Sequence, residues 1–69
     1  MAEQYYALYD YQASDESGLT FRQGETIWVH EKGNTGWWNG ETQTSRGWFP
    51  ESYVQKLVFS FLFQMNKIK

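Results

Sequence analysis

Aromatic residues are the feature of this chain that most limits how it can fold. They make up 20% of the 69 residues, with four Trp, five Tyr and five Phe. A chain of this length forms one domain at most and buries only a small core. We therefore expect several large rings to remain on the surface, where a contiguous apolar patch usually marks a binding site.

The composition indicates an ordered domain and argues against several functions. Apolar residues make up 41% of the chain and charged residues 20%, which is typical of a globular protein. The absence of cysteine excludes disulfides and cysteine-bound metal, and it fits a reducing, cytoplasmic setting. We expect neither a membrane span nor a secretion signal, because no stretch approaches ~20 apolar residues and the N-terminus lacks the basic-then-apolar pattern.

Short alternating segments between glycine-marked turns predict an all-β fold. Residues 3–11 are expected to form a strand that enters a loop, and further strands are expected at residues 19–21, 26–29, 37–41, 47–49 and 54–57. Gly24 suits a turn with a positive φ, and residues 51–53 fit a single helical turn. Pro50 should end the strand before it, because proline cannot donate to a sheet ladder. The pattern indicates a small, strongly bent barrel or a two-sheet sandwich.

One face of these strands supplies a plausible core. Its expected members are Ala7, Leu19, Phe21, Ile27, Val29, Phe49 and Val54. Trp37 and Trp38 are adjacent in a strand and must point to opposite faces, so one of them is exposed. The remaining tyrosines, tryptophans and Pro50 would form rigid apolar walls with donors at their rims. Such a surface suits a proline-rich segment, which is already in the polyproline II conformation and offers free carbonyls.

Other ligands and chemistries fit the chain less well. Single-stranded nucleic acid also stacks on exposed rings, but it needs a basic track. Residues 1–57 hold all eight acids of the chain and only four of its six bases, since Lys67 and Lys69 lie beyond them. A cage for methylated lysine suits an acidic barrel but gives no reason for Pro50 beside the rings. We expect no catalysis, metal or cofactor, because His30 is the only histidine and cysteine is absent.

Six motifs together resemble the Src homology 3 (SH3) domain family. They are Ala7-Leu8-Tyr9-Asp10-Tyr11, Leu19-Thr20-Phe21, Gly24-Glu25, Trp37-Trp38, Gly47-Trp48-Phe49-Pro50 and Tyr53-Val54. The resemblance covers about residues 4–57. It implies an all-β, five-stranded barrel of two orthogonal antiparallel sheets with one short 3-10 turn. It also implies a monomeric adaptor module of signalling, cytoskeletal or endocytic proteins that binds proline-rich (PxxP) segments of intracellular partners.

The resemblance further implies a peptide-binding site at defined positions. Its members would be Tyr9, Tyr11, Asp15, Glu16, Trp37, Trp48, Pro50 and Tyr53. Tyr9 and Tyr53 would wall one proline pocket. The second would lie among Tyr11, Trp37, Pro50 and Tyr53. Trp37 would also donate its indole hydrogen to a carbonyl of the ligand.

A third pocket would bind an arginine or lysine that flanks the proline motif. Trp48 would flank it, and Asp15 and Glu16 would supply the charge, with Glu16 the better placed by resemblance. Arginine pairs with a carboxylate more specifically than lysine, through two parallel hydrogen bonds. The chain departs from the family pattern at Gly18, where an acid is frequent, and at Ser52, where asparagine is frequent. These departures affect the motif preference rather than the class of ligand.

Three further residues are expected to have structural roles. Trp38 would face away from the ligand, Glu25 would stabilise a turn, and Asp10 would hold the backbone of its loop. Residues 58–69 are expected to lie outside the barrel, either disordered or as the start of a following segment. Six of the seven residues 57–63 are apolar, so this run is an aggregation hazard if it is exposed.

Overall fold

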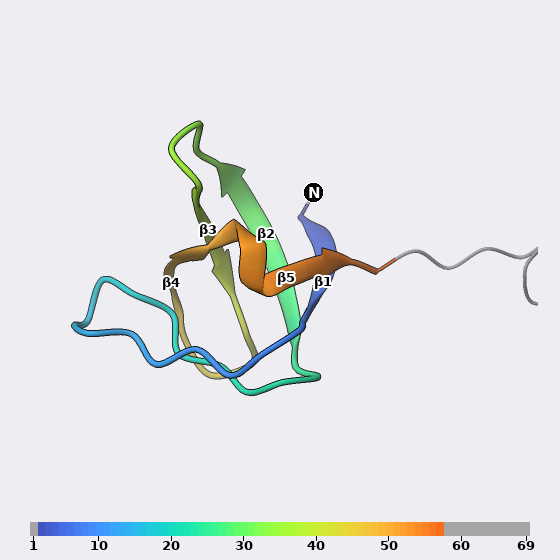
Figure 1. Ribbon diagram of the computed structural model, residues 1–69, viewed down its shortest axis with the longest axis horizontal. Helices are drawn as coiled ribbons and strands as arrows, with labels where there is room; N and C mark the ends of the chain where they lie inside the picture. The colour runs from blue at the N-terminus through green and yellow to red at the C-terminus, as the bar shows by residue number, and fades with distance from the viewer. Residues whose placement is uncertain (1, 58–69) are drawn as a thin grey trace, which may run out of the picture.

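Within the described residues, the first and last strands lie side by side in a five-stranded antiparallel sheet. The computed structural model describes residues 2–57 (Figure 1). The strands are β1 (Glu3–Ala7), β2 (Thr26–Lys32), β3 (Trp37–Glu41), β4 (Arg46–Pro50) and β5 (Val54–Lys56), and a 3-10 turn, η1 (Glu51–Tyr53), precedes β5. Their order in the sheet is β4-β3-β2-β1-β5. The all-β fold with five strands and one 3-10 turn is confirmed, and hydrogen bonds join the strands into one continuous sheet.

Most strand boundaries lie within one residue of the sequence prediction, but two segments differ more. Residues 19–21 form no strand, and the sheet pairing around this segment is limited to the single bridges Tyr11–Phe21 and Gly18–Trp48. β2 continues to Lys32, with an irregular register in its pairing with β3. Alternation over three residues indicates an extended backbone, but a ladder also requires a partner strand alongside. The partner depends on how the whole chain folds, so this prediction was wrong.

The core contains all seven residues that the alternation predicted, and Tyr5 in addition. The buried apolar side chains are Tyr5, Ala7, Leu19, Phe21, Ile27, Val29, Phe49 and Val54. At their centre Phe21 and Phe49 pack edge to face, with ring centroids 5.7 Å apart. Tyr5 lies two residues before Ala7 in β1 and pairs with Ile27 of β2, so it faces inward, and Tyr6 faces outward.

Two carboxylates stabilise the turn that leads into β2. Glu25 accepts a hydrogen bond from the backbone N–H of Arg22 at 2.8 Å, which confirms its predicted structural role. Asp10 accepts one from the backbone N–H of Gln23 at 2.7 Å, so it holds the backbone of the loop to which it belongs, as predicted. Gly24 has the predicted positive φ, 90°, a conformation that glycine adopts without steric cost. These contacts anchor the C-terminal end of the long loop between β1 and β2.

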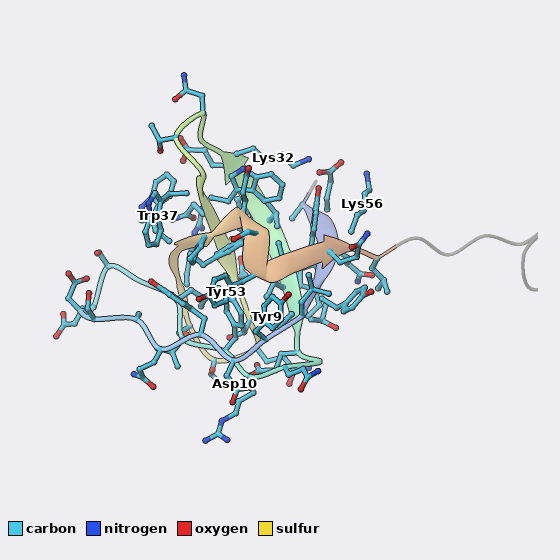
Figure 2. All side chains as sticks on the ribbon, in the orientation of Figure 1. Tyr9, Asp10, Lys32, Trp37, Tyr53 and Lys56 are labelled. Carbon is cyan, nitrogen blue, oxygen red and sulfur yellow. The ribbon has the colours of Figure 1, made fainter. Side chains whose placement is uncertain are left out.

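Glu3 joins β1 to the strands on both of its sides. Its carboxylate lies 2.6 Å from Nζ of Lys32 on β2 and 3.1 Å from Nζ of Lys56 on β5; both lysines are labelled in Figure 2. The Lys32 ammonium also lies 5.4 Å from the ring centroid of Tyr5 and 5.1 Å from that of Trp38. Lys32, and then Lys56, lower the pKa of Glu3, while Glu3 and then Tyr5 raise the pKa of Lys32.

The predicted tail, residues 58–69, lies outside the described residues, as does Met1. The boundaries of the domain at residues 4 and 57 remain a prediction. Within residues 2–57, no helix is long and apolar enough to cross a membrane.

Candidate functional site

Four aromatic side chains meet next to the 3-10 turn, and we call Tyr9, Tyr11, Trp37 and Tyr53 the aromatic surface. Tyr53 lies between two other tyrosines, with its ring centroid 5.5 Å from that of Tyr9 and 5.4 Å from that of Tyr11. The Tyr11 and Trp37 centroids are 6.4 Å apart. Figure 2 shows Tyr9 and Tyr53 close together below η1, with Trp37 farther along the same row. The four rings therefore form one continuous series.

These rings come from three segments that backbone hydrogen bonds bring together. Tyr9 and Tyr11 follow β1, where Leu8 N–H donates to the Tyr53 carbonyl at 2.8 Å. Trp37 is the first residue of β3 and pairs with Pro50, the last residue of β4 and the N-cap of η1. Pro50 thus ends its strand, as predicted. It also places the 3-10 turn that carries Tyr53 directly beside Trp37.

The exposed fractions of the rings show which of them are available to a ligand and which pack against the core. Trp37 is 45% exposed and Tyr9 57% exposed. Tyr11 and Tyr53 are half-buried and pack against the core with one side. Trp38 points to the other face, where its ring lies 5.3 Å from that of Tyr5, so the prediction of opposite faces for the two tryptophans is confirmed. One side of the aromatic surface therefore packs against the core, and the other side is open to solvent.

Next to the aromatic surface, the loop of residues 12–18 encloses a hollow of about 260 Å³, which we call the loop hollow. Its lining residues are Tyr11, Ser14, Asp15, Ser17, Gly18, Trp37 and Trp48. Tyr11 and Trp37 thus belong both to this hollow and to the aromatic surface. Asp15 supplies the only charged side chain of the lining. Glu16 lies exposed in the same loop but does not line the hollow.

The loop is held against β4 by both backbone groups of Trp48. The N–H of Trp48 donates to the Ser17 carbonyl at 2.9 Å, and its carbonyl accepts from Leu19 N–H at 2.8 Å. This contact needs Gly47, because a Cβ there would lie 2.6 Å from the carbonyl carbon of Gly18 and 2.8 Å from the Ser17 oxygen. The missing side chain at position 47 therefore lets the loop reach the sheet.

Ser17 also determines how the Asp15 carboxylate is held. Oδ1 of Asp15 accepts hydrogen bonds from the Ser17 hydroxyl at 2.6 Å and from the Ser17 backbone N–H at 2.9 Å. The hydroxyl bond, followed by the backbone bond, lowers the pKa of Asp15 below its ordinary value of 3.8. The carboxylate is therefore ionised at neutral pH and is the fixed negative charge of the loop hollow.

The structure brings together most of the residues that the sequence pointed to, in two adjoining places. Tyr9, Tyr11, Trp37 and Tyr53 form the aromatic surface beside Pro50, and Asp15 and Trp48 join them in the loop hollow. Sequence reasoning assigned no role to Ser14 and Ser17. The Asp-x-Ser spacing at positions 15–17 could have identified the contact of Ser17 with Asp15, because aspartate often accepts a hydrogen bond from the backbone two residues on.

Rings, hydroxyls and one fixed charge equip this site for noncovalent recognition. Tyrosines packed edge to face and an exposed indole give apolar walls with hydrogen-bond donors at their edges. The carboxylate beside two indoles suits a cation. Within residues 2–57, no group of three or more histidine or carboxylate side chains is placed to hold a metal ion.

Comparisons with known proteins connect this geometry to a family. The profile of the SH3 domain matches residues 6–51. Myosin heavy chain IB of Acanthamoeba castellanii is 53% identical over 51 residues, which make up 74% of this chain but only 4% of that protein. The SH3 domain of Acanthamoeba myosin I bound to Acan125 superposes with a TM-score of 0.76 and 50% identity, covering 81% of this chain and 97% of that one.

A second solved domain is similar to the same extent. It is the C-terminal SH3 domain of myosin IB from Entamoeba histolytica bound to an EhFP10(GEF) peptide, with a TM-score of 0.78 and 38% identity. The alignment covers 84% of this chain and 97% of that domain. The similarity therefore extends over nearly the whole of each solved domain, but over a small part of the myosin heavy chain.

Proposed function

Because the chain belongs to the SH3 domain family, we propose that it recruits partner proteins by binding their proline-rich segments on the aromatic surface. The observation that carries this function is the unbroken row of four rings, with centroid separations of 5.4, 5.5 and 6.4 Å. A polyproline II segment presents its prolines at a regular spacing and loses little chain entropy on binding. The role is one of docking, without a covalent step.

We assign the two proline pockets from the geometry of the rings. Tyr9 and Tyr53, whose rings meet edge to face, would wall the first pocket. The second would lie between Tyr53 and Trp37, above the half-buried ring of Tyr11. The Trp37 indole is exposed and would donate its N–H to a carbonyl of the ligand backbone.

The loop hollow is the proposed third pocket, for an arginine or lysine beside the proline motif. Its single carboxylate, Asp15, is held by two hydrogen bonds and lies in the lining with the indoles of Trp37 and Trp48. An arginine could pair with this carboxylate while its planar group lies against an indole. Asp15 is therefore the proposed contact, and Glu16 would add attraction from the exposed side of the loop.

The expected partners are intracellular proteins, bound weakly by a monomeric domain. A groove of this kind buries less than a standard protein interface of ~1,200 Å² or more, so we expect dissociation constants on the order of micromolar. Family membership gives no support to nucleic acid or methylated lysine as the ligand. The excess of acidic residues in residues 1–57 also opposes binding to a phosphate backbone.

A titration with matched peptides tests this function. Isotope-labelled protein would be titrated with a proline-rich peptide that carries one flanking arginine, and with the same peptide carrying glycine in its place. We expect both to shift the signals of the aromatic surface in a saturable way, and the arginine peptide to shift Asp15 as well.

Two outcomes would contradict the proposal. One is that signals of the aromatic surface stay unmoved in excess of several different proline-rich peptides. The other is that a single-stranded oligonucleotide shifts them more strongly and in a salt-sensitive way. As a test of charge, Glu16→Lys should weaken the arginine peptide and leave the glycine peptide nearly unchanged.

A further inference from the structure

A second hollow lies at the opposite end of β3 from the aromatic surface. It has a volume of about 430 Å³ and is lined by Gln4, Glu25, Thr26, Trp28, Gln43 and Thr44. Trp28 pairs with Glu41, the last residue of β3, whereas the aromatic surface uses Trp37, the first. We call this place the Trp28 hollow. It shares no lining residue with the loop hollow or with the aromatic surface.

Trp28 is the one tryptophan that neither the core nor the proposed peptide site uses. Its neighbours Ile27 and Val29 are buried in the core, so the alternation of β2 turns Trp28 to the outer face of the sheet. The indole is half-buried there, and among residues 2–57 its ring has no stacked or edge-to-face aromatic partner. It thus offers an apolar face inside a concave, otherwise polar surface.

The groups around this indole are one carboxylate and several uncharged side chains that can accept hydrogen bonds as well as donate them. Glu25 contributes the only charge of the lining, and its hydrogen bond to the backbone N–H of Arg22 uses Oε2. The carboxamides of Gln4 and Gln43 in the lining each offer an acceptor oxygen to a ligand. No lysine or arginine belongs to the lining. The site therefore combines a flat aromatic face, one carboxylate and further acceptors, without a competing cation.

An arginine side chain matches this combination better than other side chains. The guanidinium group is planar and stacks on indole faces, and it has five N–H donors and no acceptor. Lysine is a more strongly hydrated point charge and gains less from a flat ring. The acidic balance of residues 1–57, eight acids against four bases, also favours a cationic ligand.

We propose that the Trp28 hollow binds an arginine side chain of a protein partner, stacked on the indole of Trp28 and hydrogen-bonded to Glu25 and the two glutamines. Because this hollow and the aromatic surface lie at opposite ends of β3, both can be occupied at once. A partner that carries a proline-rich segment and a separate arginine would bind through two linked contacts, and each contact would raise the effective concentration of the other.

A small probe without proline tests the hollow independently of peptide binding. N-acetyl-arginine methylamide would be titrated into the labelled protein while the indole N–H signals of the four tryptophans are followed. We expect the Trp28 signal to shift in a saturable way, and the lysine analogue to bind more weakly. No movement of Trp28, or movement only of Trp37 and Trp48, would overturn the proposal.

Two matched variants make the test specific. Gln43 and Gln55 are both exposed, but only Gln43 lines the hollow. Gln43→Lys places a like charge beside the arginine and should weaken the probe about fivefold, the effect of two unit charges ~4 Å apart in water. Gln55→Lys, with the same change in net charge, should alter the affinity by less than about twofold.

The variants also separate this proposal from the proposed function. An equal effect of Gln43→Lys and Gln55→Lys would show a response to net charge alone and would overturn the arginine site. Binding of a proline-rich peptide to the aromatic surface should be the same in both variants, whichever result the arginine probe gives.

Discussion

The hydroxyl of Ser17 donates to Oδ1 of Asp15 at 2.6 Å and holds this carboxylate in the lining of the loop hollow. We predict that Ser17→Ala reduces the preference for arginine-flanked over neutral proline-rich peptides by roughly two- to fivefold, the range expected for an exposed charge contact. Ser17→Thr, which keeps a hydroxyl, should retain the preference. Titration calorimetry with the two peptides measures it.

A second measurement on the same variant distinguishes positioning from general damage to the loop. Loss of the hydroxyl donor should raise the pKa of Asp15 toward 3.8, which the carboxyl carbon signal reports directly. If Ser17→Ala weakens neutral and arginine-flanked peptides equally, Ser17 is not acting through Asp15.

The ion pairs of Glu3 predict how stability responds to acid. Lys32 and Lys56 lower the pKa of Glu3 below 4.5, its ordinary value. Their contribution to the free energy of unfolding is therefore fully present above about pH 4.5, and it is lost as the pH falls through the lowered pKa of the folded state. Glu3→Gln should be less stable than the parent chain at about pH 6, and the difference should vanish by about pH 2. Urea unfolding at both values measures this, and a difference that persists in acid would rule out the ion pairs as its source.

The adjacent tryptophans of β3 should respond to mutation in opposite ways. Trp37 is 45% exposed, so Trp37→Ala should change the free energy of unfolding by less than about 1 kcal/mol. It should nevertheless weaken proline-rich peptides at least ~30-fold, as for a binding hot spot. Trp38 packs against Tyr5, so Trp38→Ala should destabilise the fold by roughly 2–4 kcal/mol. Urea unfolding and peptide titration on both variants test the pair; a Trp37→Ala chain that is folded and still binds would place the site elsewhere.

Gly47 is predicted to be required for the close contact between the loop of residues 12–18 and β4. Gly47→Ala places a methyl group against the backbone of Gly18 and Ser17, at distances of 2.6–2.8 Å, and should destabilise the fold by roughly 1–3 kcal/mol. The amide signals of Ser17 and Trp48 should move with it. Gly24→Ala is the control, because a Cβ at position 24 meets no atom within 4 Å and only the positive φ of 90° opposes it. A Gly47→Ala chain whose loop signals are unchanged would contradict the close approach.

The predicted domain boundary leads to a simple truncation. Leu57 N–H donates to the Gln4 carbonyl at 2.9 Å, so a chain that ends at residue 57 keeps the described contacts of β1 and β5. We expect this shortened chain to fold and to bind proline-rich peptides with unchanged affinity. Loss of cooperative unfolding in the truncated chain would instead assign residues 58–69 to the domain.

Local patterns in the sequence were sufficient for much of the fold. Alternation along each strand identified Ile27, Val29 and Phe49 as core residues, because neighbouring side chains in a strand must face opposite ways. The same rule separated Trp37 from Trp38. Gly24 was recognisable because few other residues adopt its positive φ without cost. These features depend on a residue and its immediate neighbours, so no knowledge of distant contacts was needed.

The sequence alone thus determined the all-β class, most of the core and the presence of surplus rings for a binding surface. Only the tertiary structure decided that Asp15 rather than Glu16 lines the loop hollow, and that Trp28 lies in a polar concavity. Each of these depends on strand register or on a close backbone approach such as that of Gly47 to Gly18. Such contacts join residues far apart in the chain, and they exist only once the whole sheet has formed.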